Sequence, residues 1–413
     1  MTDPSPARPE LSFDGDRSKD TIRLAEASIR QTLDAGQRVE HVLPGLVPNT
    51  DDERRRVGMD TMRVLRCDQN WVDSFDLGRI DDYLASGDLG NDRCSVIDPT
   101  SGRGRPYTQS PPPLGRRPAS AETVAFAFCD SASALQSQRT IALNDAHMRL
   151  GWNTIELCDD LATAFRSYVQ VNCYLSYGDA SGFGAHWDDH DVVVIQLAGR
   201  KHWEVHEPTE LGALSAFTPP GATKRSIWSG LLTPGTALFI PRGWPHSVAG
   251  LDDEPSVHLT LSNRRMNGID VLGMTDDDVV AEPELLDLAA INSARATWCA
   301  QIPTRPVGGP FDLIAARKAG FAAHQIRLTM PGGYVFSEDT SAPDRLALAA
   351  NGRLLEIDRA ATDGLCHLLT HQWTSTEDLT EHGINAKQVN GLINALGNAG
   401  CLHLRPSAER SPE

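Results

Sequence analysis

Residues 171–203 read VNCYLSYGDASGFGAHWDDHDVVVIQLAGRKHW, and this stretch is the best guide to both the fold and the chemistry. It contains His186 and Asp188 as an H-x-D pair, and the later segment PRGWPHSVAG supplies His246. Two imidazoles and one carboxylate can hold one face of an octahedral transition metal and leave the other positions open. The sequence therefore predicts a metal site formed by His186, Asp188 and His246.

The context of each ligand separates it from other polar residues nearby. His186 and Asp188 follow the Gly-rich loop SGFGA and precede the apolar run VVVIQL. Residues two apart on an extended segment point to the same side, so both can reach one ion. His246 follows a strand that ends at the tight turn PRGWP. His190 has the same period as Asp188, and we expect it to line the pocket or to contact a ligand.

A rival pair, His202 and Glu204, is disfavoured by strand alternation. Successive side chains of a strand point to opposite faces. For the segment KHWEVH we expect Lys201, Trp203 and Val205 to point inward, and His202, Glu204 and His206 to point into solvent.

Composition narrows the class of protein. The chain has 413 residues, enough for two or three domains. Its net charge of -17 argues against non-specific nucleic-acid binding, which requires a basic surface, and would suit a basic protein partner. Eight cysteines without a C-x-x-C pair indicate reduced thiols. We expect a soluble, cytoplasmic protein without a membrane span, because no 18-residue apolar run occurs.

Short β-rich runs separated by Gly and Pro turns extend from residue 168 to residue 263. Such spacing is typical of a sandwich or barrel, and it includes the double-stranded β-helix of the cupin type. The runs are Tyr168–Leu175, Val192–Leu197, His202–His206, Ser226–Leu232, Ala237–Pro241, His246–Ala249 and Val257–Ser262.

The N-terminal part is expected to be helical and irregular. Residues 1–20 are polar and Pro-rich, which predicts a disordered tail. Apolar spacing predicts helices at Thr21–Leu43, Leu77–Ala85 and Glu156–Phe165. Between them, residues 99–118 are dense in Pro, Gly and Arg, and this predicts an irregular loop, either a linker or a lid that contacts substrate.

The C-terminal part changes character after residue 264. Helices are expected at Val280–Ile291 and Phe311–Phe321, in a segment (264–325) too small for a core of its own, which favours packing against a second subunit. In residues 326–413, short strands precede helices and a final strand, the order of a winged helix-turn-helix. The segment 385–400 contains a single basic residue, Lys387, so we expect no direct DNA binding.

The predicted metal site leaves three coordination positions, enough for a bidentate 2-oxo acid and O2. Such a co-substrate needs a cation for its distal carboxylate, and Lys201 is placed to supply it. An inward lysine on an apolar strand is costly unless it meets an anion. Asn172 and Tyr174 alternate inward on the preceding strand and could donate hydrogen bonds to the same acid, with Thr260 as a further candidate.

The motifs NCYLS, GFGAHWDDHDVVVIQLAGRKHWEV, LLTPGTALFIPRGWPHSV and SVHLTLS, in this order, resemble the ribosomal-oxygenase branch of the JmjC-type 2-oxoglutarate oxygenases. The resemblance covers roughly residues 165–405. It implies a mainly β core (double-stranded β-helix, JmjC cupin type) in residues 21–263 with an N-terminal helical extension. A helical dimerisation segment (264–325) and a C-terminal winged-helix domain (326–413) would follow.

By the same resemblance, Fe(II) would be bound by His186, Asp188 and His246. The co-substrate 2-oxoglutarate would be bound by Lys201, Asn172 and Tyr174. The chain would be a homodimeric hydroxylase of a protein or peptide side chain, most plausibly in a ribosomal protein. Two alternatives stay open at this point: the same chemistry on a peptide or amino acid in a biosynthetic pathway, and a catalytically silent cupin that acts as a binding or scaffold protein.

Overall fold

The computed structural model describes most of the chain, which forms two compact units. One unit comprises Gln37–Asp160 and Val169–Arg264, and the other comprises Met1–Gly36, Leu161–Tyr168 and Arg265–Glu413. The residues described are 11–12, 19–47, 61–85, 94–98, 103–106, 128–179, 182, 184–208, 225–251, 254–266, 288–301, 310–319, 321, 324–330, 332–339, 342–382 and 384–407.

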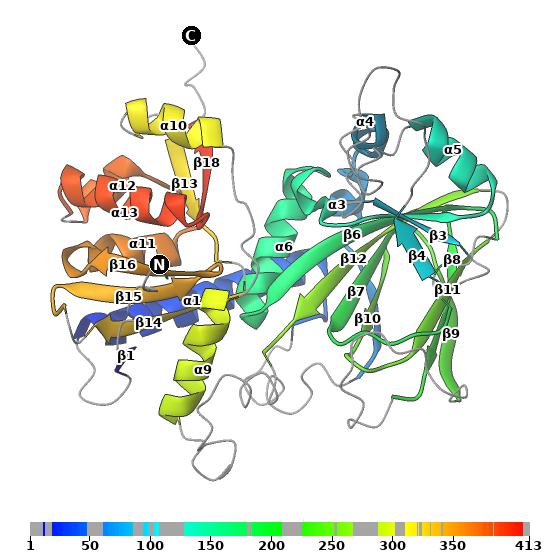
Figure 1. Cartoon of the computed structure of the whole chain (residues 1–413), viewed down its shortest axis with the longest axis horizontal. Helices are drawn as coiled ribbons and strands as arrows, with labels where there is room; N and C mark the ends of the chain where they lie inside the picture. Colours follow the sequence, from blue (N-terminus) through cyan, green and yellow to red (C-terminus); the bar gives the residue numbers. More distant parts are fainter. Residues whose placement is uncertain are drawn as a thin grey trace, which may run out of the picture. The chain divides into compact units, whose positions relative to one another are not determined.

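The first unit is built on two antiparallel sheets (Figure 1). The larger sheet has the strand order β2-β10-β7-β12-β6-β5-β3-β4, and the smaller one has the order β11-β8-β9. Their strands are β2 (Arg63–Arg66), β3 (Cys94–Asp98), β4 (Arg103–Pro106), β5 (Thr140–Leu143), β6 (Tyr168–Tyr177), β7 (Asp191–Ala198), β8 (Lys201–His206), β9 (Ser226–Leu232), β10 (Thr236–Ile240), β11 (His246–Gly250) and β12 (Pro255–Arg264).

The two sheets share one hydrophobic core. Val192 and Val194 of β7 and Leu238 of β10 pack against Trp203 and Val205 of β8. Apolar residues that alternate toward a common interior are the reason why two such sheets stay face to face. The predicted mainly β core is confirmed, and all seven strands expected between residues 168 and 263 are present with ends shifted by two residues at most.

Four strands of this unit that precede residue 168 were not predicted: β2, β3, β4 and β5. β2 pairs with β10, while β5 pairs with both β3 and β6 and so extends the large sheet. All four residues of β5 are buried, and a four-residue apolar run is too short to show a period in sequence. β4 lies within the range 99–118, where an irregular loop is predicted, and pairing with β3 makes four of those residues a strand.

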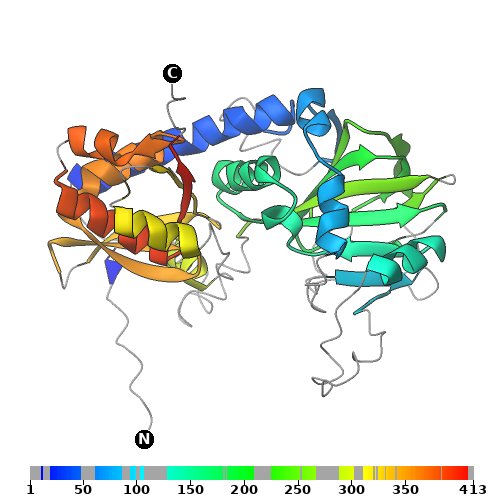
Figure 2. The same ribbon diagram turned by 90° about the horizontal axis from the view of Figure 1, so that it is seen from above.

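Helices flank the large sheet: α3 (Gln69–Asp73), α4 (Gly78–Ala85), α5 (Phe128–Gln136) and α6 (Trp152–Phe165). The predicted helices at 77–85 and 156–165 are confirmed as α4 and α6. Asp76 does act at the start of α4, because its Oδ1 accepts a hydrogen bond from Gly78 N at 2.9 Å. α5 contacts β5 beside the sheet, as seen from above in Figure 2.

The second unit contains a four-stranded sheet in the order β1-β14-β15-β16, formed by Leu11–Ser12, Tyr334–Asp339, Arg345–Ala350 and Arg353–Asp358. Helix α9 (Leu288–Gln301) packs on it through Trp298 and Cys299. The helix predicted at 280–291 begins only at Leu288 within the described residues and continues to Gln301. The disordered tail predicted for residues 1–20 is wrong for β1, which pairs with β14, and for the start of α1 (Lys19–Val42).

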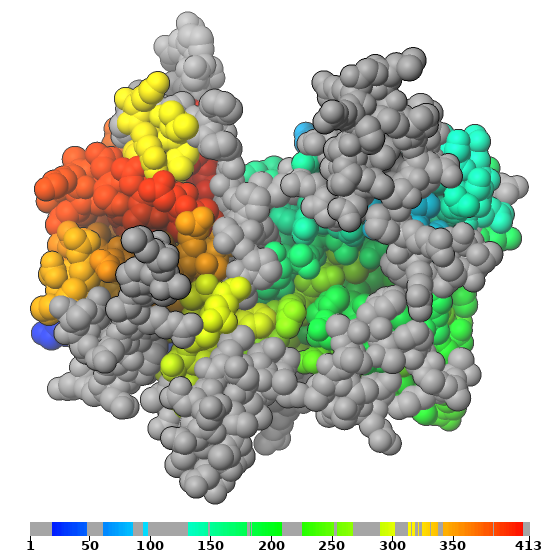
Figure 3. Space-filling view, viewed as in Figure 1, coloured from blue at the N-terminus to red at the C-terminus, as the bar shows by residue number. Residues whose placement is uncertain are grey.

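The C-terminal part of this unit combines a three-stranded sheet, β17-β13-β18, with three helices whose atoms form one continuous orange-to-red surface (Figure 3). The strands are Thr374–Ser375, His324–Leu328 and Leu402–Pro406, and the helices are α11 (Thr362–Thr370), α12 (Thr376–Glu381) and α13 (Ala386–Asn398). Helix α10 (Pro310–Ala319) precedes them.

Local capping explains where two of these helices begin. Ser375 and Asp378 form a capping box at α12, and Asn385 and Gln388 form another at α13. Each box satisfies backbone N–H groups that have no partner inside the helix. The helices and the final strand predicted for residues 326–413 are confirmed, whereas their classification as a winged helix stays a prediction. Among the described residues, no helix is long and apolar enough to cross a bilayer.

Candidate metal centre and pocket

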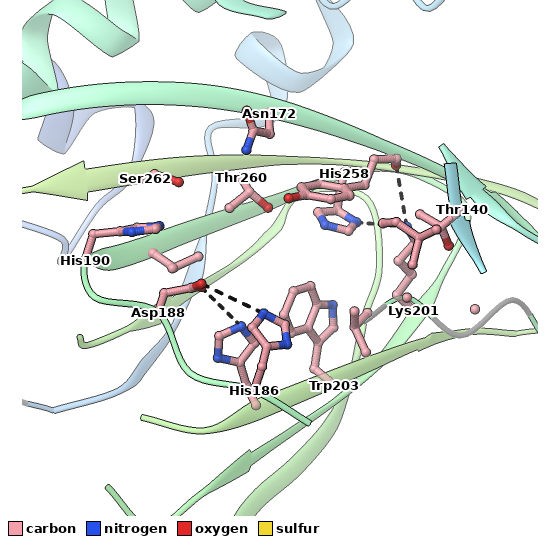
Figure 4. Close-up of a pocket in the computed structure, with 17 residues that line it drawn as sticks. Thr140, Asn172, His186, Asp188, His190, Lys201, Trp203, His258, Thr260 and Ser262 are labelled. Carbon is pink, nitrogen blue, oxygen red and sulfur yellow. Dashed lines mark hydrogen bonds and ion pairs between the residues drawn. The ribbon is translucent and has the colours of Figure 1, made fainter. Parts of the chain in front are cut away.

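His186, Asp188 and His246 converge as the sequence predicts (Figure 4). One ligand atom from each lies within 4.8 Å of the other two. Asp188 is central: its Oδ1 lies 3.9 Å from His186 Nε2 and its Oδ2 lies 3.6 Å from His246 Nε2. Two imidazoles and a carboxylate form the facial donor set of non-haem Fe(II) sites, so the residues present fit that metal.

Main-chain carbonyls orient both imidazoles. His186 Nδ1 lies 2.9 Å from Gly184 O, and His246 Nδ1 lies 3.0 Å from Trp244 O. A carbonyl can only accept, so each Nδ1 carries the proton and donates it, which leaves each Nε2 unprotonated on the side of Asp188. Burial, followed by the neighbouring His186, lowers the pKa of His246 to about 4, and the neutral ring is the form that binds a metal.

Backbone hydrogen bonds hold the two ligand segments together. His186 N donates to His246 O at 3.0 Å, and His246 N donates to His186 O at 2.7 Å. The PRGWP turn is fixed to the same segment, because Gly243 N donates to Asp188 O and Arg242 N donates to the Asp191 carboxylate. The ligands are therefore placed by the main chain, which explains why a residue distant in sequence completes the site.

A cavity of about 220 Å³ lies between the two sheets beside the triad. Every predicted site residue lines it, together with others that the sequence did not single out. The lining comprises Ile97, Thr140, Asn172, Tyr174, Gly182, His186, Asp188, His190, Val192, Lys201, Trp203, His246, Val248, Gly250, His258, Thr260 and Ser262.

Lys201 is buried at the end of this cavity, 2 % exposed, as strand alternation predicts. Its Nζ lies 2.9 Å from His258 Nδ1 and 3.5 Å from Tyr174 O. Because an ammonium only donates, His258 Nδ1 accepts, and His258 is neutral with its proton on Nε2. Burial lowers the pKa of Lys201 to about 7, and burial together with the Lys201 charge lowers the pKa of His258 well below its usual value.

His258 is the main functional residue that the sequence reasoning missed. It lies on β12 in phase with Thr260 and Ser262, so all three face the pocket. Its ring stacks on Tyr174 at 4.9 Å between centroids and meets Trp203 edge-on at 5.4 Å. Thr260 was a candidate from the motif SVHLTLS, and strand alternation applied to that motif would have placed His258, two residues earlier, on the same face.

The predicted hydrogen-bond donors sit on the wall opposite the triad. Asn172 and Tyr174 alternate toward the cavity on β6, and Thr260 faces it from β12. Burial, with a smaller contribution from the charge of Asp188, raises the pKa of Tyr174 to about 12, so its hydroxyl keeps its proton and can donate. The Asn172 Oδ1 accepts from Asp145 N at 3.3 Å, which orients the amide.

His190 lines the cavity beside Asp188, as expected. Its Nδ1 lies 3.2 Å from Asp189 Oδ1. Burial acts to lower the pKa of His190, but the hydrogen bond with Asp189 and the charges of Asp188 and its acidic neighbours outweigh it, so the pKa is raised.

One residue of the alternating segment behaves differently from its prediction. His202 is exposed and Glu204 half-buried, but His206 is buried. The pairing of β8 with β9 shifts register between Val205 and His206. A bulge places one extra residue in the strand and breaks the alternation there, so the prediction that His206 lies in solvent is wrong.

Known proteins resemble this chain in sequence over one segment and in fold over most of its length. The segment from residue 147 to residue 271 matches the JmjC domain family. The bifunctional lysine-specific demethylase and histidyl-hydroxylase NO66 of Brugia malayi is 34% identical over 112 residues, or 25% of this chain and 16% of that protein. Ribosomal oxygenase 1 of Gallus gallus is 36% identical over 108 residues, or 25% of this chain and 18% of that protein. The matched segment thus spans less than a fifth of either relative.

Solved structures extend the likeness to most of the chain. The crystal structure of Escherichia coli ribosomal oxygenase YcfD covers 87% of this chain and 99% of its own, with a TM-score of 0.53 and 16% sequence identity. A complex of YcfD with cobalt and 2-oxoglutarate superimposes with a TM-score of 0.52. The overall fold is shared at this level, and the predicted resemblance to the JmjC-type ribosomal oxygenases is confirmed.

Proposed function

We propose that this chain is an Fe(II)- and 2-oxoglutarate-dependent hydroxylase of a protein side chain. The observation that carries the proposal is the placement of Lys201 in the same cavity as the metal triad. Its buried Nζ contacts His258 Nδ1 and Tyr174 O and, among the described residues, no carboxylate. Burial of a lone ammonium is unfavourable, and an anionic ligand would relieve it.

Different residues of the cavity would bind different parts of this co-substrate. The triad would hold Fe(II), and the metal would supply the oxidising chemistry with O2 when bound. Lys201 would bind the distal carboxylate of 2-oxoglutarate at the other end. Asn172, Tyr174 and Thr260 would donate hydrogen bonds to the acid from β6 and β12. The balanced reaction converts R–H, 2-oxoglutarate and O2 to R–OH, succinate and CO2.

The substrate class is inferred from the relatives, one named a histidyl-hydroxylase and others named ribosomal oxygenases. We infer a side chain of a ribosomal protein. Ribosomal proteins are commonly basic, and the net charge of -17 on this chain is suited to attract them. The alternative of a peptide or amino acid from a biosynthetic pathway differs only in what enters the cavity, so the same assay can distinguish it. A silent scaffold is disfavoured by the intact triad.

Two further features belong to this proposal. The helical segment 264–325 is inferred to form a homodimer contact, and the helices and strands of residues 326–413 are inferred to be a winged-helix domain without direct DNA binding. Both follow from the resemblance to ribosomal oxygenases, and we place the protein in the cytoplasm on the same basis.

The test is incubation of the protein with Fe(II), 2-oxoglutarate and a ribosomal extract. We expect one ribosomal protein to gain a single oxygen atom by intact-mass spectrometry, with one succinate formed per oxygen added. His186→Ala, which removes a ligand, should give neither product. Succinate formation without a modified ribosomal protein would favour the small-substrate alternative, and absence of iron binding would reject the enzyme.

A further inference from the structure

The indole of Trp203 lies between the two ends of the cavity. It projects from β8 two residues after Lys201, and both line the same space. On one side its ring stacks against His246 at 6.0 Å between centroids, and on another it meets His258 edge-on at 5.4 Å. Trp203 therefore touches one metal ligand and the residue that holds Lys201.

The N–H of this indole has no hydrogen-bond acceptor among the described residues, although the side chain is only 3 % exposed. An indole N–H is a hydrogen-bond donor only, so it needs an acceptor atom as its partner. Buried tryptophans usually find a partner, because an unpaired buried donor is unfavourable. Figure 4 shows the indole nitrogen on the side of the ring that faces Lys201, away from Asp188.

We propose that the Trp203 N–H donates a hydrogen bond to the distal carboxylate of the bound co-substrate, as a second donor beside Lys201. This role rests on the proposed function. A carboxylate has two oxygens and about four acceptor sites, so an ammonium and an indole N–H can bind it together. The pair selects a dicarboxylate: a 2-oxo acid without the distal carboxylate would leave the indole donor unpaired.

The direct test is the indole N–H resonance in a ¹⁵N-correlated spectrum of the full chain loaded with Zn²⁺, which occupies the metal site without oxidation chemistry. With 2-oxoglutarate we expect the Trp203 N–H proton to move downfield. With 2-oxobutyrate, which keeps the metal-binding end but lacks the distal carboxylate, it should stay in place. A purely structural tryptophan would respond equally to both acids.

The matching variants are Trp203→Phe and, as a control, Trp228→Phe. Trp228 packs at the edge of the same hydrophobic core but does not line the cavity. Loss of a hydrogen bond to a charged group is expected to weaken 2-oxoglutarate binding about tenfold or more in Trp203→Phe. Binding of 2-oxobutyrate should change little in Trp203→Phe, and binding of both acids should change little in Trp228→Phe.

The outcomes separate this inference from the proposed function. If 2-oxoglutarate binds the unmodified protein but no indole resonance distinguishes it from 2-oxobutyrate, the role of Trp203 is rejected while the hydroxylase proposal stands. If 2-oxoglutarate does not bind at all, both are rejected. Should Trp203→Phe fail to fold, the spectrum of the unmodified protein still decides, because one of its eight tryptophans must respond to the dicarboxylate alone.

Discussion

The two ends of the cavity are constructed in opposite ways. At the triad end, main-chain carbonyls orient His186 and His246, and backbone hydrogen bonds join the segments that carry them. At the other end, Lys201 sits on a regular strand, and its nearest partner is a side chain, His258. A metal requires fixed ligand geometry, whereas a carboxylate requires a charge in a dry site. We infer that metal binding at the triad depends mainly on ligand geometry, and that co-substrate binding at Lys201 depends mainly on protonation.

The largest expected effect comes from breaking the triad end. His186→Ala should lower turnover by more than about a hundredfold, since loss of a residue that merely supports a metal ligand already costs 10- to 100-fold. Bound iron, measured by elemental analysis after desalting, should fall with it. His202→Ala, which alters an exposed histidine on β8, is the matched control and should keep both. Full turnover in His186→Ala would refute the ligand assignment.

Removal of the charge at the other end should affect binding more than chemistry. Lys201→Met keeps the length of the side chain and removes the ammonium. We expect the KM for 2-oxoglutarate to rise roughly 10- to 100-fold, from loss of a charged hydrogen bond, with the iron content unchanged. Lys318→Met, at an exposed position of α10, serves as the control. An unchanged KM in Lys201→Met would show that another cation binds the co-substrate.

Protonation of Lys201 should make co-substrate binding depend on pH. The pKa of this lysine is lowered to about 7 by burial, so the ammonium is present below pH 7 and is lost as pH rises above it. A bound carboxylate favours the ammonium and raises that pKa. We therefore expect affinity to be constant below about pH 7 and to fall by up to about tenfold per pH unit above it.

Calorimetry in two buffers with different ionisation enthalpies would measure the accompanying proton uptake near pH 8. Lys201→Met should abolish that uptake. Affinity and proton uptake that are independent of pH between 6 and 9 would contradict a buried lysine with a pKa near 7.

A smaller effect is expected from His258, which positions the lysine rather than the metal. His258→Phe keeps a ring against Tyr174 and Trp203 but removes the acceptor for Lys201 Nζ. Loss of one hydrogen bond of this type should raise the KM for 2-oxoglutarate about 3- to 10-fold, without loss of iron. His258→Gln restores an acceptor and should recover part of the affinity. Equal KM values in both variants would show that the contact with Lys201 is not what matters.

The same comparison explains how much of the site could be predicted from sequence. The triad was predictable because a local H-x-D pair and a characteristic turn mark it, and Lys201 because alternation on an apolar strand is regular. Strand alternation could have placed His258 on the pocket face, but its contact with Lys201, 57 residues away in sequence, is visible only in the fold. The register shift at His206 was not predicted, because a bulge leaves no recognisable sequence pattern in so short a strand.

Outside the site, the elements that could be predicted were the long ones whose pattern is visible in the local sequence. Long amphipathic helices such as α1 and capped ones such as α13 show a clear period, and the ends of α1 were predicted within two residues. Strands β2, β3 and β5 are four or five residues long and gain their stability by joining a sheet formed elsewhere in the chain. Their stability is therefore not encoded locally, and no window of sequence could reveal it.

The reciprocal hydrogen bonds between His186 and His246 have a consequence for the protein before any metal arrives. They form an isolated antiparallel bridge between two metal ligands, so two amide protons are withheld from solvent at the metal site. Slow deuterium uptake at these two positions in the metal-free protein would mean that the metal site is already formed before iron binds. Rapid uptake would mean instead that the His186–His246 bridge forms only when the metal binds.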